Sequence, residues 1–478
     1  MLQIQHRLIN KIAFLFLIYL GTAAAQSGNE PILIIGNELI GRVENGQSVR
    51  EVNGNVVLKQ GNVTINCDRV IQYLAQNNAR LIGNVIVHQD TLTIKTPEGY
   101  YYGNDKRAYS NRGVELNDKK VILTASEGEY FFKLHKADFN TNVKLYDTAS
   151  TLTSQKLIYY RFENKAIASK SVKIVESENT IYADSLIHLR NEKTSFCFSN
   201  ILLRNSKDGM NIFGEHLEDY RAKNYSLIDK APLLIQFDTS YNAAKDSIIR
   251  IDTLTIKSNR MEAFRDSTNL FLATGDVKII RSDFSSLNDI TKYSKNLELI
   301  ETWKVSDSAR IPTLWYSLNQ MTGDSIRILL KDNRIQKTIV KLNAMLISQN
   351  EKYQKRMDQI SGSSITLFFN DNKLVSSDIA GNALSYYYLY DDGEPNGIIK
   401  ASARELRTFF EEKQVSDVKL YGDPKSEFHP EALVKGKENQ FILPGMKLYT
   451  DKPIMSDLIS AKQIAFLNRT TPNPKKTK

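Results

Sequence analysis

The side chains that could do chemistry are scattered through the sequence rather than gathered into motifs. No two histidines have a metal-binding H-x-x-x-H spacing. The serine-hydrolase motif G-x-S-x-G and the phosphate-binding motifs G-x-x-x-x-G-K-[ST] and G-x-G-x-x-G do not occur. Asp68 and Asp184 recur as single turn residues and do not cluster. We therefore expect no catalytic residues, no metal site and no cofactor. The histidines are His6, His88, His135, His188, His216 and His429.

Composition and charge describe a globular chain that is not built for nucleic acid. The 478 residues are 41% hydrophobic and 24% charged, and the formal net charge is +9. Arg7 and Lys11 contribute two of the positive charges in a segment that we expect to be removed. Lys475, Lys476 and Lys478 contribute three more in a proline-containing tail. The folded body is thus only mildly basic, and we expect no nucleic-acid partner.

The amino terminus has the order of a secretory signal peptide. A basic start is followed by an apolar run over residues 12–20 and then by small residues, with Ala23 and Ala25 as the cleavage pair before Gln26. A membrane anchor is the alternative, but the run is far shorter than the roughly twenty residues that span a bilayer. The sequence therefore predicts export, with residues 1–25 removed.

The body of the chain is a repeat with a period of 29 residues. Three columns of apolar residues keep this period, which is typical of proteins whose units bury their apolar faces by stacking on one another. The columns are Val56, Val85, Val114, Val143, Val172 and Ile201; Ile65, Ile94, Leu123, Leu152 and Ile181; and Tyr73, Tyr102, Phe131, Tyr160 and Leu189.

Each repeat unit alternates apolar and polar residues, as half-buried strands do. Val143-Lys144-Leu145 and Val172-Lys173-Ile174 show the alternation, and turn-forming pairs such as Asn117-Asp118 separate the strands. No amphipathic helix is evident before residue 200, which disfavours helical repeats. The sequence therefore predicts an all-β, repeat-built fold.

The second half repeats more loosely. Phe368-Phe369 and Phe409-Phe410 each precede a glycine by about twelve residues, and the two copies are 41 residues apart. We interpret this as the same architecture with longer loops. The predicted organisation is a signal peptide over 1–25, a repeat domain over 26–230, a more irregular β domain over 231–430, and a partly disordered extension over 431–478.

The apolar columns predict either an open trough or a dry core, and the residues alone do not decide between these. Stacked Val, Ile and Leu would hold long acyl chains without directional chemistry, because each buried methylene contributes about 0.8 kcal/mol. By alternation, Lys95, Lys144 and Lys173 face the other way and are expected to be solvated. The candidate lining residues are Val56, Leu58, Ile65, Val85, Val87, Ile94, Val114, Leu116, Leu123, Val143, Leu145, Leu152, Val172, Ile174 and Ile181.

The repeated phrase resembles a known family. The signal peptide is followed by the phrase Gly54-Asn55-Val56, by a strand that ends at Tyr73, and by the next copy of the phrase, Gly83-Asn84-Val85. A small residue followed by an acidic one occurs again at Ala183-Asp184. This combination resembles the OstA-like family of lipopolysaccharide-transport proteins, which includes LptA and the periplasmic domain of LptD. The resemblance implies an open β-jelly roll, with two antiparallel sheets in a V whose apolar faces hold lipid acyl chains in the periplasm.

The expected function is therefore binding lipopolysaccharide and carrying it towards the outer membrane, without catalysis. Expected partners are lipopolysaccharide and other Lpt components, joined end to end by strand addition, and self-association is possible within this scheme. The segment Ile32–Asn37 is either the first, docking strand or an internal strand covered by its own hairpin. A secreted scaffold or adhesin, and a β-helix polysaccharide enzyme, remain the alternatives. Cys67 and Cys197 fall in different columns and are expected to be free, partly buried thiols.

Overall fold

The computed structural model describes residues 30–470, apart from 208, 242–247, 283, 332–333, 372 and 412–413. The predicted signal peptide and its cleavage site at Ala25–Gln26 lie outside the described residues. The chain divides into two compact units, residues 1–141 and 142–478, which are described separately here. The domain boundaries expected near residues 230 and 430 stay predictions. None of the helices over the described residues is long and apolar enough to cross a membrane.

Short and long strands build the first unit, and the unit boundary falls inside its last strand. The strands are β1 (Leu33–Ile35), β2 (Glu38–Glu44), β3 (Gln47–Gln60), β4 (Val63–Tyr73), β5 (Asn78–Gln89), β6 (Leu92–Tyr102), β7 (Arg107–Ser110), β8 (Val114–Asn117), β9 (Ile122–Ala125), β10 (Glu127–Phe131) and β11 (Lys136–Tyr146).

The second unit continues with strands and ends in short helices. Its strands are β12 (Thr151–Tyr160), β13 (Lys165–Glu176), β14 (Asn179–Leu189), β15 (Thr194–Asn205), β16 (Met210–Tyr220), β17 (Tyr225–Asp229), β18 (Leu233–Tyr241), β19 (Ile248–Lys257), β20 (Arg260–Phe264), β21 (Leu270–Arg281), β22 (Phe284–Ser294), β23 (Leu299–Trp303), β24 (Thr313–Tyr316), β25 (Asn319–Thr322), β26 (Ser325–Lys331), β27 (Arg334–Gln349), β28 (Met357–Asn370), β29 (Lys373–Asp391), β30 (Glu394–Glu411), β31 (Gln414–Tyr421) and β32 (Lys425–Pro430). Its helices are η1 (Arg221–Lys223), η2 (Lys295–Leu297), α2 (Glu431–Val434), η3 (Glu438–Gln440), α3 (Met455–Leu458) and α4 (Ala461–Thr470).

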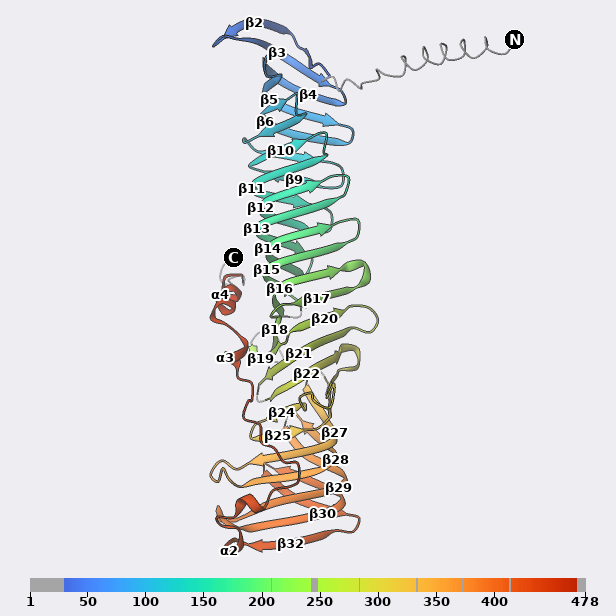
Figure 1. Cartoon of the computed structure of the whole chain (residues 1–478), viewed down its shortest axis with the longest axis vertical. Helices are drawn as coiled ribbons and strands as arrows, with labels where there is room; N and C mark the ends of the chain where they lie inside the picture. The colour runs from blue at the N-terminus through green and yellow to red at the C-terminus, as the bar shows by residue number, and fades with distance from the viewer. Residues whose placement is uncertain are drawn as a thin grey trace, which may run out of the picture. The chain divides into compact units, whose positions relative to one another are not determined.

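Long strands pair with their neighbours in sequence, always antiparallel. The pairs β3–β4 and β5–β6 in the first unit, and β13–β14 and β28–β29 in the second, follow this rule. Figure 1 shows the strands of each unit as successive layers of hairpins. The all-β, repeat-built fold predicted from the columns is therefore confirmed.

Alternate long strands bend at the Gly-Asn step of the repeat. Gly83 and Asn84 have φ of 75° and 45°, and the pairing of β5 with β6 is interrupted between Ile82 and Val85. The same step in β13 is made by Lys170 and Ser171, with φ of 65° and 56°. Left-handed backbone is easiest for glycine and next for asparagine, which explains the recurring motif. We call this two-residue bend the corner.

An asparagine–aspartate hydrogen bond ties a corner to the neighbouring strand. The amide of Asn84 donates to Asp68 at 2.9 Å, and the amide of Asn200 donates to Asp184 at 2.5 Å. These are the two carboxylates that recur in the sequence motif. They hold the bend in place instead of forming a reactive cluster.

The corner divides its strand into two halves, the pairing with the facing strand is interrupted at the same level, and both halves line one apolar interior. In β13, Ala166 and Ala168 precede the corner and Val172 and Ile174 follow it, and all four are buried. Lys173, between the last two, is exposed, as the alternation predicts. The interior therefore lies between two layers of half-strands.

Alternation breaks down from β14 to β18 in the second unit, where both faces of the sheet are covered. Cross-strand pairing places Tyr182, Leu202, Phe213 and Leu233 in one row that begins at the exposed Lys173, on the face turned away from the interior. This row is apolar and buried beneath the carboxy-terminal segment, where the covering side chains are Leu458, Ile459, Phe466 and Leu467. Figure 1 shows α3 and α4 lying along these strands.

The beginning of this carboxy-terminal segment is fixed by polar contacts. The guanidinium of Arg356 donates to Glu431 at 2.6 and 2.7 Å and to Glu438 at 3.3 Å. The amide of Gln359 donates to the carbonyl of Phe441 at 2.9 Å and accepts from the N–H of Leu443 at 2.8 Å. Residues 431–449 are thus firmly anchored.

Candidate functional site

All fifteen candidate lining residues lie in the interior. Each is at most 7% exposed, and those up to Leu123 belong to the first unit while those from Val143 onward belong to the second. The structure therefore brings them into the columns that the period predicts. That they contact a ligand stays a prediction.

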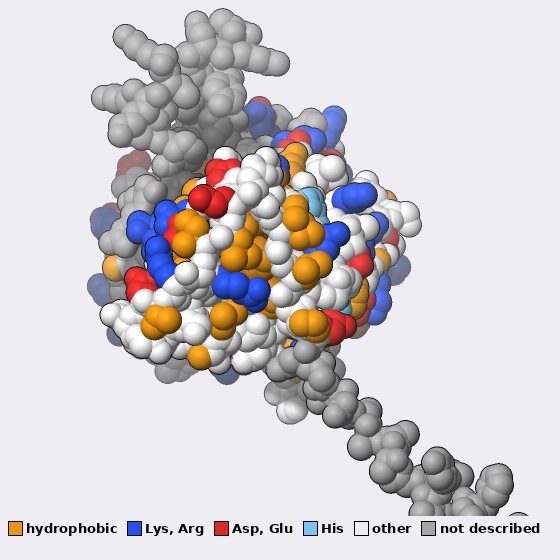
Figure 2. Space-filling model, turned by 90° about the horizontal axis from the view of Figure 1, so that it is seen from above, with side chains coloured by type: hydrophobic (Ala, Val, Ile, Leu, Met, Phe, Trp, Pro, Cys, Tyr) orange, Lys and Arg blue, Asp and Glu red, His pale blue; other side chains and the backbone are white. Residues whose placement is uncertain are grey.

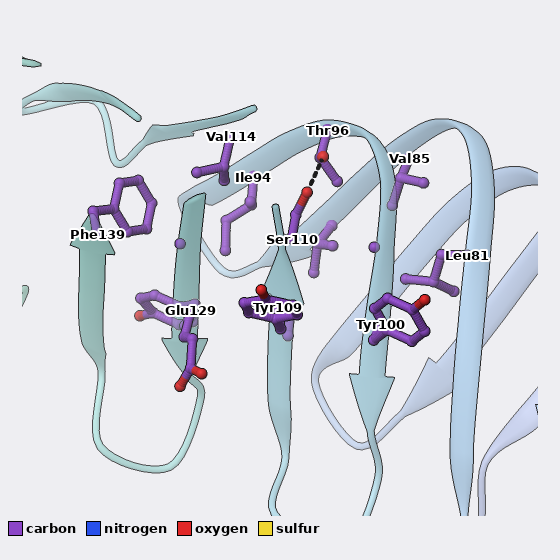
Figure 3. A pocket seen from close by; sticks show the side chains of 15 residues that line it. Leu81, Val85, Ile94, Thr96, Tyr100, Tyr109, Ser110, Val114, Glu129 and Phe139 are labelled. Atoms are coloured by element: carbon purple, nitrogen blue, oxygen red, sulfur yellow. Dashed lines mark hydrogen bonds between the residues drawn. The ribbon is translucent and has the colours of Figure 1, made fainter. Parts of the chain in front are cut away.

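The interior of the first unit is closely packed. A cavity lined by Leu81, Val85, Ile94, Tyr109 and Phe139 has a volume of about 20 Å³ (Figure 3). This is room for about one water molecule. An acyl chain could enter only if the two layers moved apart.

A larger, open hollow lies next to this cavity. Its volume is about 780 Å³, and it shares Val85, Thr96 and Val114 with the cavity. Its rim carries Lys95 and Arg112, both exposed. Glu115 also lines the hollow and lies 3.8 Å from Lys95, so Arg112 is the cationic side chain of the rim that is not part of this ion pair.

Opposite edges of the stack meet in the first unit. Gln60 lies at the β3–β4 turn, whereas Tyr101 lies near the β6–β7 turn, on the other edge. The hydroxyl of Tyr101 nevertheless donates to Gln60 Oε1 at 2.5 Å. Beside this contact, Lys106 Nζ donates to Glu30 at 2.8 Å. We call the line along which the two edges meet the seam.

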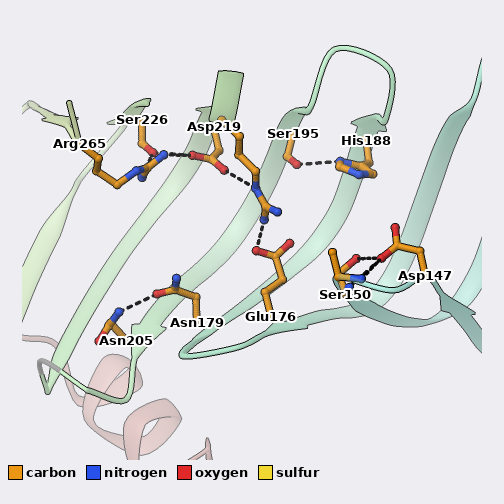
Figure 4. Close-up of polar contacts among 12 residues, drawn as sticks. Asp147, Ser150, Glu176, Asn179, His188, Ser195, Asn205, Asp219, Ser226 and Arg265 are labelled. Atoms are coloured by element: carbon orange, nitrogen blue, oxygen red, sulfur yellow. Dashed lines mark hydrogen bonds and ion pairs between the residues drawn. The ribbon is translucent and has the colours of Figure 1, made fainter. Parts of the chain in front are cut away.

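In the second unit the seam is made by arginines and carboxylates. Arg190, in the β14–β15 turn, donates to Asp147, in the β11–β12 turn, at 2.8 Å. Arg221, after β16, forms an ion pair with Glu176, at the β13–β14 turn. Alternate turns of an antiparallel stack lie at opposite edges, so both contacts bridge the two layers. The V expected from the resemblance is therefore closed on its open side (Figure 4).

The Arg190–Asp147 pair of this seam is largely shielded from water, whereas the side chains of Arg221 and Arg265 are 35% and 45% exposed. The side chains of Arg190 and Asp147 are 13% and 15% exposed. Burial by itself would raise the pKa of Asp147, but hydrogen bonds from the N–H groups of Ala149 and Ser150, with the charge of Arg190, bring that pKa below its usual value. Burial, reinforced by Arg190, lowers the pKa of His188, which contacts Ser195 at 2.9 Å. At neutral pH the seam thus holds arginine–carboxylate pairs beside a neutral histidine.

Sequence reasoning missed the seam, although a signal for it is present. An arginine directly follows the end of four strands, and two of these strands end at the third-column residues Tyr160 and Leu189. The contacts join residues 43 and 45 positions apart, about one and a half periods. These arginines are Arg161, Arg190, Arg221 and Arg265.

Residues 32–184 match the OstA-like protein family. This part of the chain is OstA-like. The match contains the corners at Gly54, Gly83 and Lys170, and all fifteen candidate lining residues fall within it. No curated protein matches the chain.

Among solved structures, the chain is similar to LptH from Pseudomonas aeruginosa. That protein is the LptA-homologous periplasmic component of the conserved lipopolysaccharide transport device. The identity is 14%, the TM-score is 0.16, and the match covers 30% of this chain and 94% of LptH.

Proposed function

We propose that this protein binds lipopolysaccharide in the periplasm and passes it towards the outer membrane without chemical conversion. The observation that carries the proposal is the apolar interior, built from both halves of every strand over an OstA-like region. The lipid's acyl chains would lie between the layers, among Val143, Leu152 and Val172. Nothing directional is needed, so chains can slide from one repeat to the next.

The free energy gained when acyl chains are buried is on the scale needed to open a closed interior. A chain of about twelve methylenes would gain roughly 10 kcal/mol on leaving water. That gain can offset the separation of ion pairs whose charges reach water when the layers part, because exposed pairs contribute only about 0–1 kcal/mol each. An interior that is packed when empty is therefore compatible with carriage.

The amino-terminal end offers a surface for assembly. In the described residues, β1 and β2 pair only with β3, and β1 lies within the Ile32–Asn37 segment predicted as the first strand. Apolar side chains gather at this end of the first unit (Figure 2). We propose that another β protein of the transport system adds a strand to this edge. The exposed apolar residues of β1 and β2 are Leu33, Ile35, Leu39, Ile40 and Val43.

A scaffold role is the second candidate, and one observation favours it. The 20 Å³ cavity of the first unit shows side chains already filling the space between the layers. If the layers never part, the columns serve only as a core, and the exposed ends would serve adhesion or assembly.

The same substitution, made on the inner and on the outer face of β13, distinguishes lipid carriage from a scaffold role. Ala168 lies in the interior and Lys173 on the outer face of β13. We expect Ala168→Phe to reduce the lipopolysaccharide that copurifies with the full chain, because the added ring occupies the space between the layers, while Lys173→Phe leaves it unchanged. Mass spectrometry measures the lipid, and circular dichroism checks the fold. Equal lipid in both variants, or none in the unmodified protein, would favour the scaffold.

A further inference from the structure

We propose that the seam of the second unit is both a lateral opening and a phosphate-binding site. In this inference, which rests on the proposed function, Arg190 and Arg221 exchange their carboxylate partners for the phosphates of a lipid headgroup, and Arg265 lies beside them on the same edge. The acyl chains of that lipid enter between the layers.

The seam is the side on which the two layers are held by side chains. At the other side the layers are continuous through the corners, where the chain itself connects them, as at Lys170–Ser171. At the seam, the contacts of Arg190 and Arg221 with the opposite edge are ion pairs of side chains. Separating these pairs opens the interior without breaking the pairing of β12, β13 and β14.

The arginines form a connected row rather than isolated pairs. Asp219 accepts from Arg265 at 2.7 Å and lies 3.4 Å from Arg221, which also contacts Glu176. Arg265 also donates to Ser226 at 2.5 Å. Figure 4 shows Glu176, Asp219 and Arg265 linked in this way. The row therefore presents guanidinium groups from successive repeats along one edge.

Carboxylates on this row can be replaced by phosphate. A guanidinium binds both anions with two parallel N–H···O contacts, and a phosphate carries more charge and more acceptor oxygens. When the seam closes, Asp147 neutralises Arg190 and Glu176 neutralises Arg221, whereas Asp219 pairs with Arg265 on the same edge. When it opens, a headgroup phosphate can take the place of Asp147 or Glu176, so that the opening and the binding of the headgroup favour each other.

The row lies beside the candidate lining residues of the same unit. Glu176 directly follows the strand segment that carries Val172 and Ile174, and Asp147 follows Leu145 by two residues. A lipid with its phosphates at the seam would therefore have its chains at these columns. This arrangement matches an amphiphile that has several acyl chains and a phosphorylated head.

A reversible cross-link tests the opening. In Asp147→Cys/Arg190→Cys, a short cleavable thiol cross-linker ties the two edges together. The control pair is Asn179→Cys/Asn205→Cys, whose parent amides hydrogen-bond at 2.9 Å along a single edge and do not bridge the layers. Cys67 and Cys197 are buried with raised pKa values, to about 11 and about 12, so they react slowly.

We expect cross-linking to reduce lipopolysaccharide loading at least tenfold in the seam pair and cleavage to restore it, with no change in the control pair. Loading that is the same before and after cleavage would overturn the lateral opening while leaving the proposed function intact. Absence of loading in the unmodified chain and in every variant would instead refute the proposed function.

A charge variant tests the phosphate site. Arg221→Gln should lower the preference for phosphorylated over dephosphorylated lipid A by about tenfold, because a hydrogen bond to a charged group is lost. Lys173→Gln, which removes a charge from the outer face, should leave that preference unchanged. An unchanged preference in Arg221→Gln would overturn the site. Circular dichroism confirms that both variants fold.

Discussion

Substitutions at two equivalent corner positions should change the stability of their strands in opposite directions. Gly83 and Lys170 both occupy the first corner residue, with φ of 75° and 65°. A side chain in the left-handed region costs about 1–2 kcal/mol. At Gly83 a Cβ would also lie 2.3 Å from Asp68 Oδ2, so the carboxylate must move and its bond with Asn84 weakens. Gly83→Ala should therefore destabilise β5 by about 2 kcal/mol.

Lys170→Gly should do the reverse. It removes the strain of a side chain in the left-handed region. The greater conformational freedom of glycine in the unfolded chain reduces the resulting stabilisation by about 0.5–1 kcal/mol. The net stabilisation of β13 is about 0.5–1 kcal/mol. Lys173→Gly is the control: Lys173 is not among the left-handed residues, so this change should destabilise by about 0.5–1 kcal/mol.

Native-state hydrogen exchange of the full chain measures these changes strand by strand, so it does not require two-state unfolding. Protection should fall in β5 for Gly83→Ala and rise in β13 for Lys170→Gly. Lower protection in β13 for both Lys170→Gly and Lys173→Gly would refute the reasoning, because it would mean that the corner carries no backbone strain.

Two further predictions concern the carboxy-terminal half. Leu458→Ser removes a buried apolar side chain that holds α3 on the outer face, so we expect faster proteolysis within residues 455–470. Leu433→Ser, at an exposed position, should leave the rate of proteolysis unchanged. Equal cleavage of both variants would contradict this packing. Burial raises the pKa of Asp358 to about 7, so the folded state favours the protonated carboxyl, and stability should fall as the pH rises from about 4 through 7. Asp358→Asn should remove that fall in urea unfolding midpoints, and an undiminished pH dependence would show that another group causes it.

The strand columns and the corner could be predicted because they repeat. Each of the fifteen lining residues follows from a 29-residue period and a two-residue alternation, both visible in the chain. The exposure of Lys144 and Lys173 follows from the same alternation. Local rules suffice here, since each position depends on neighbours at fixed distances in sequence.

The seam and the covered outer face depend on contacts that the period does not encode. Arg190 and Asp147 meet because strands bend at corners and bring opposite turns together, which no single repeat reveals. In Ile201-Leu202-Leu203 the alternation is lost, because Leu202 lies beneath a segment more than two hundred residues later. Continuous apolar runs are typical of strands buried on both faces, and that was the available signal.

The central claim is that acyl chains lie between the two layers of half-strands. Its most direct test places a photoreactive residue at Val143, Leu152 or Val172, which face the interior, and at Lys144 or Lys173, which face outward, followed by irradiation of intact cells. The account predicts lipopolysaccharide adducts at the three interior positions and none at the two lysines. Adducts at the lysines alone, or at no position in a folded protein, would contradict it and leave the columns as a closed core.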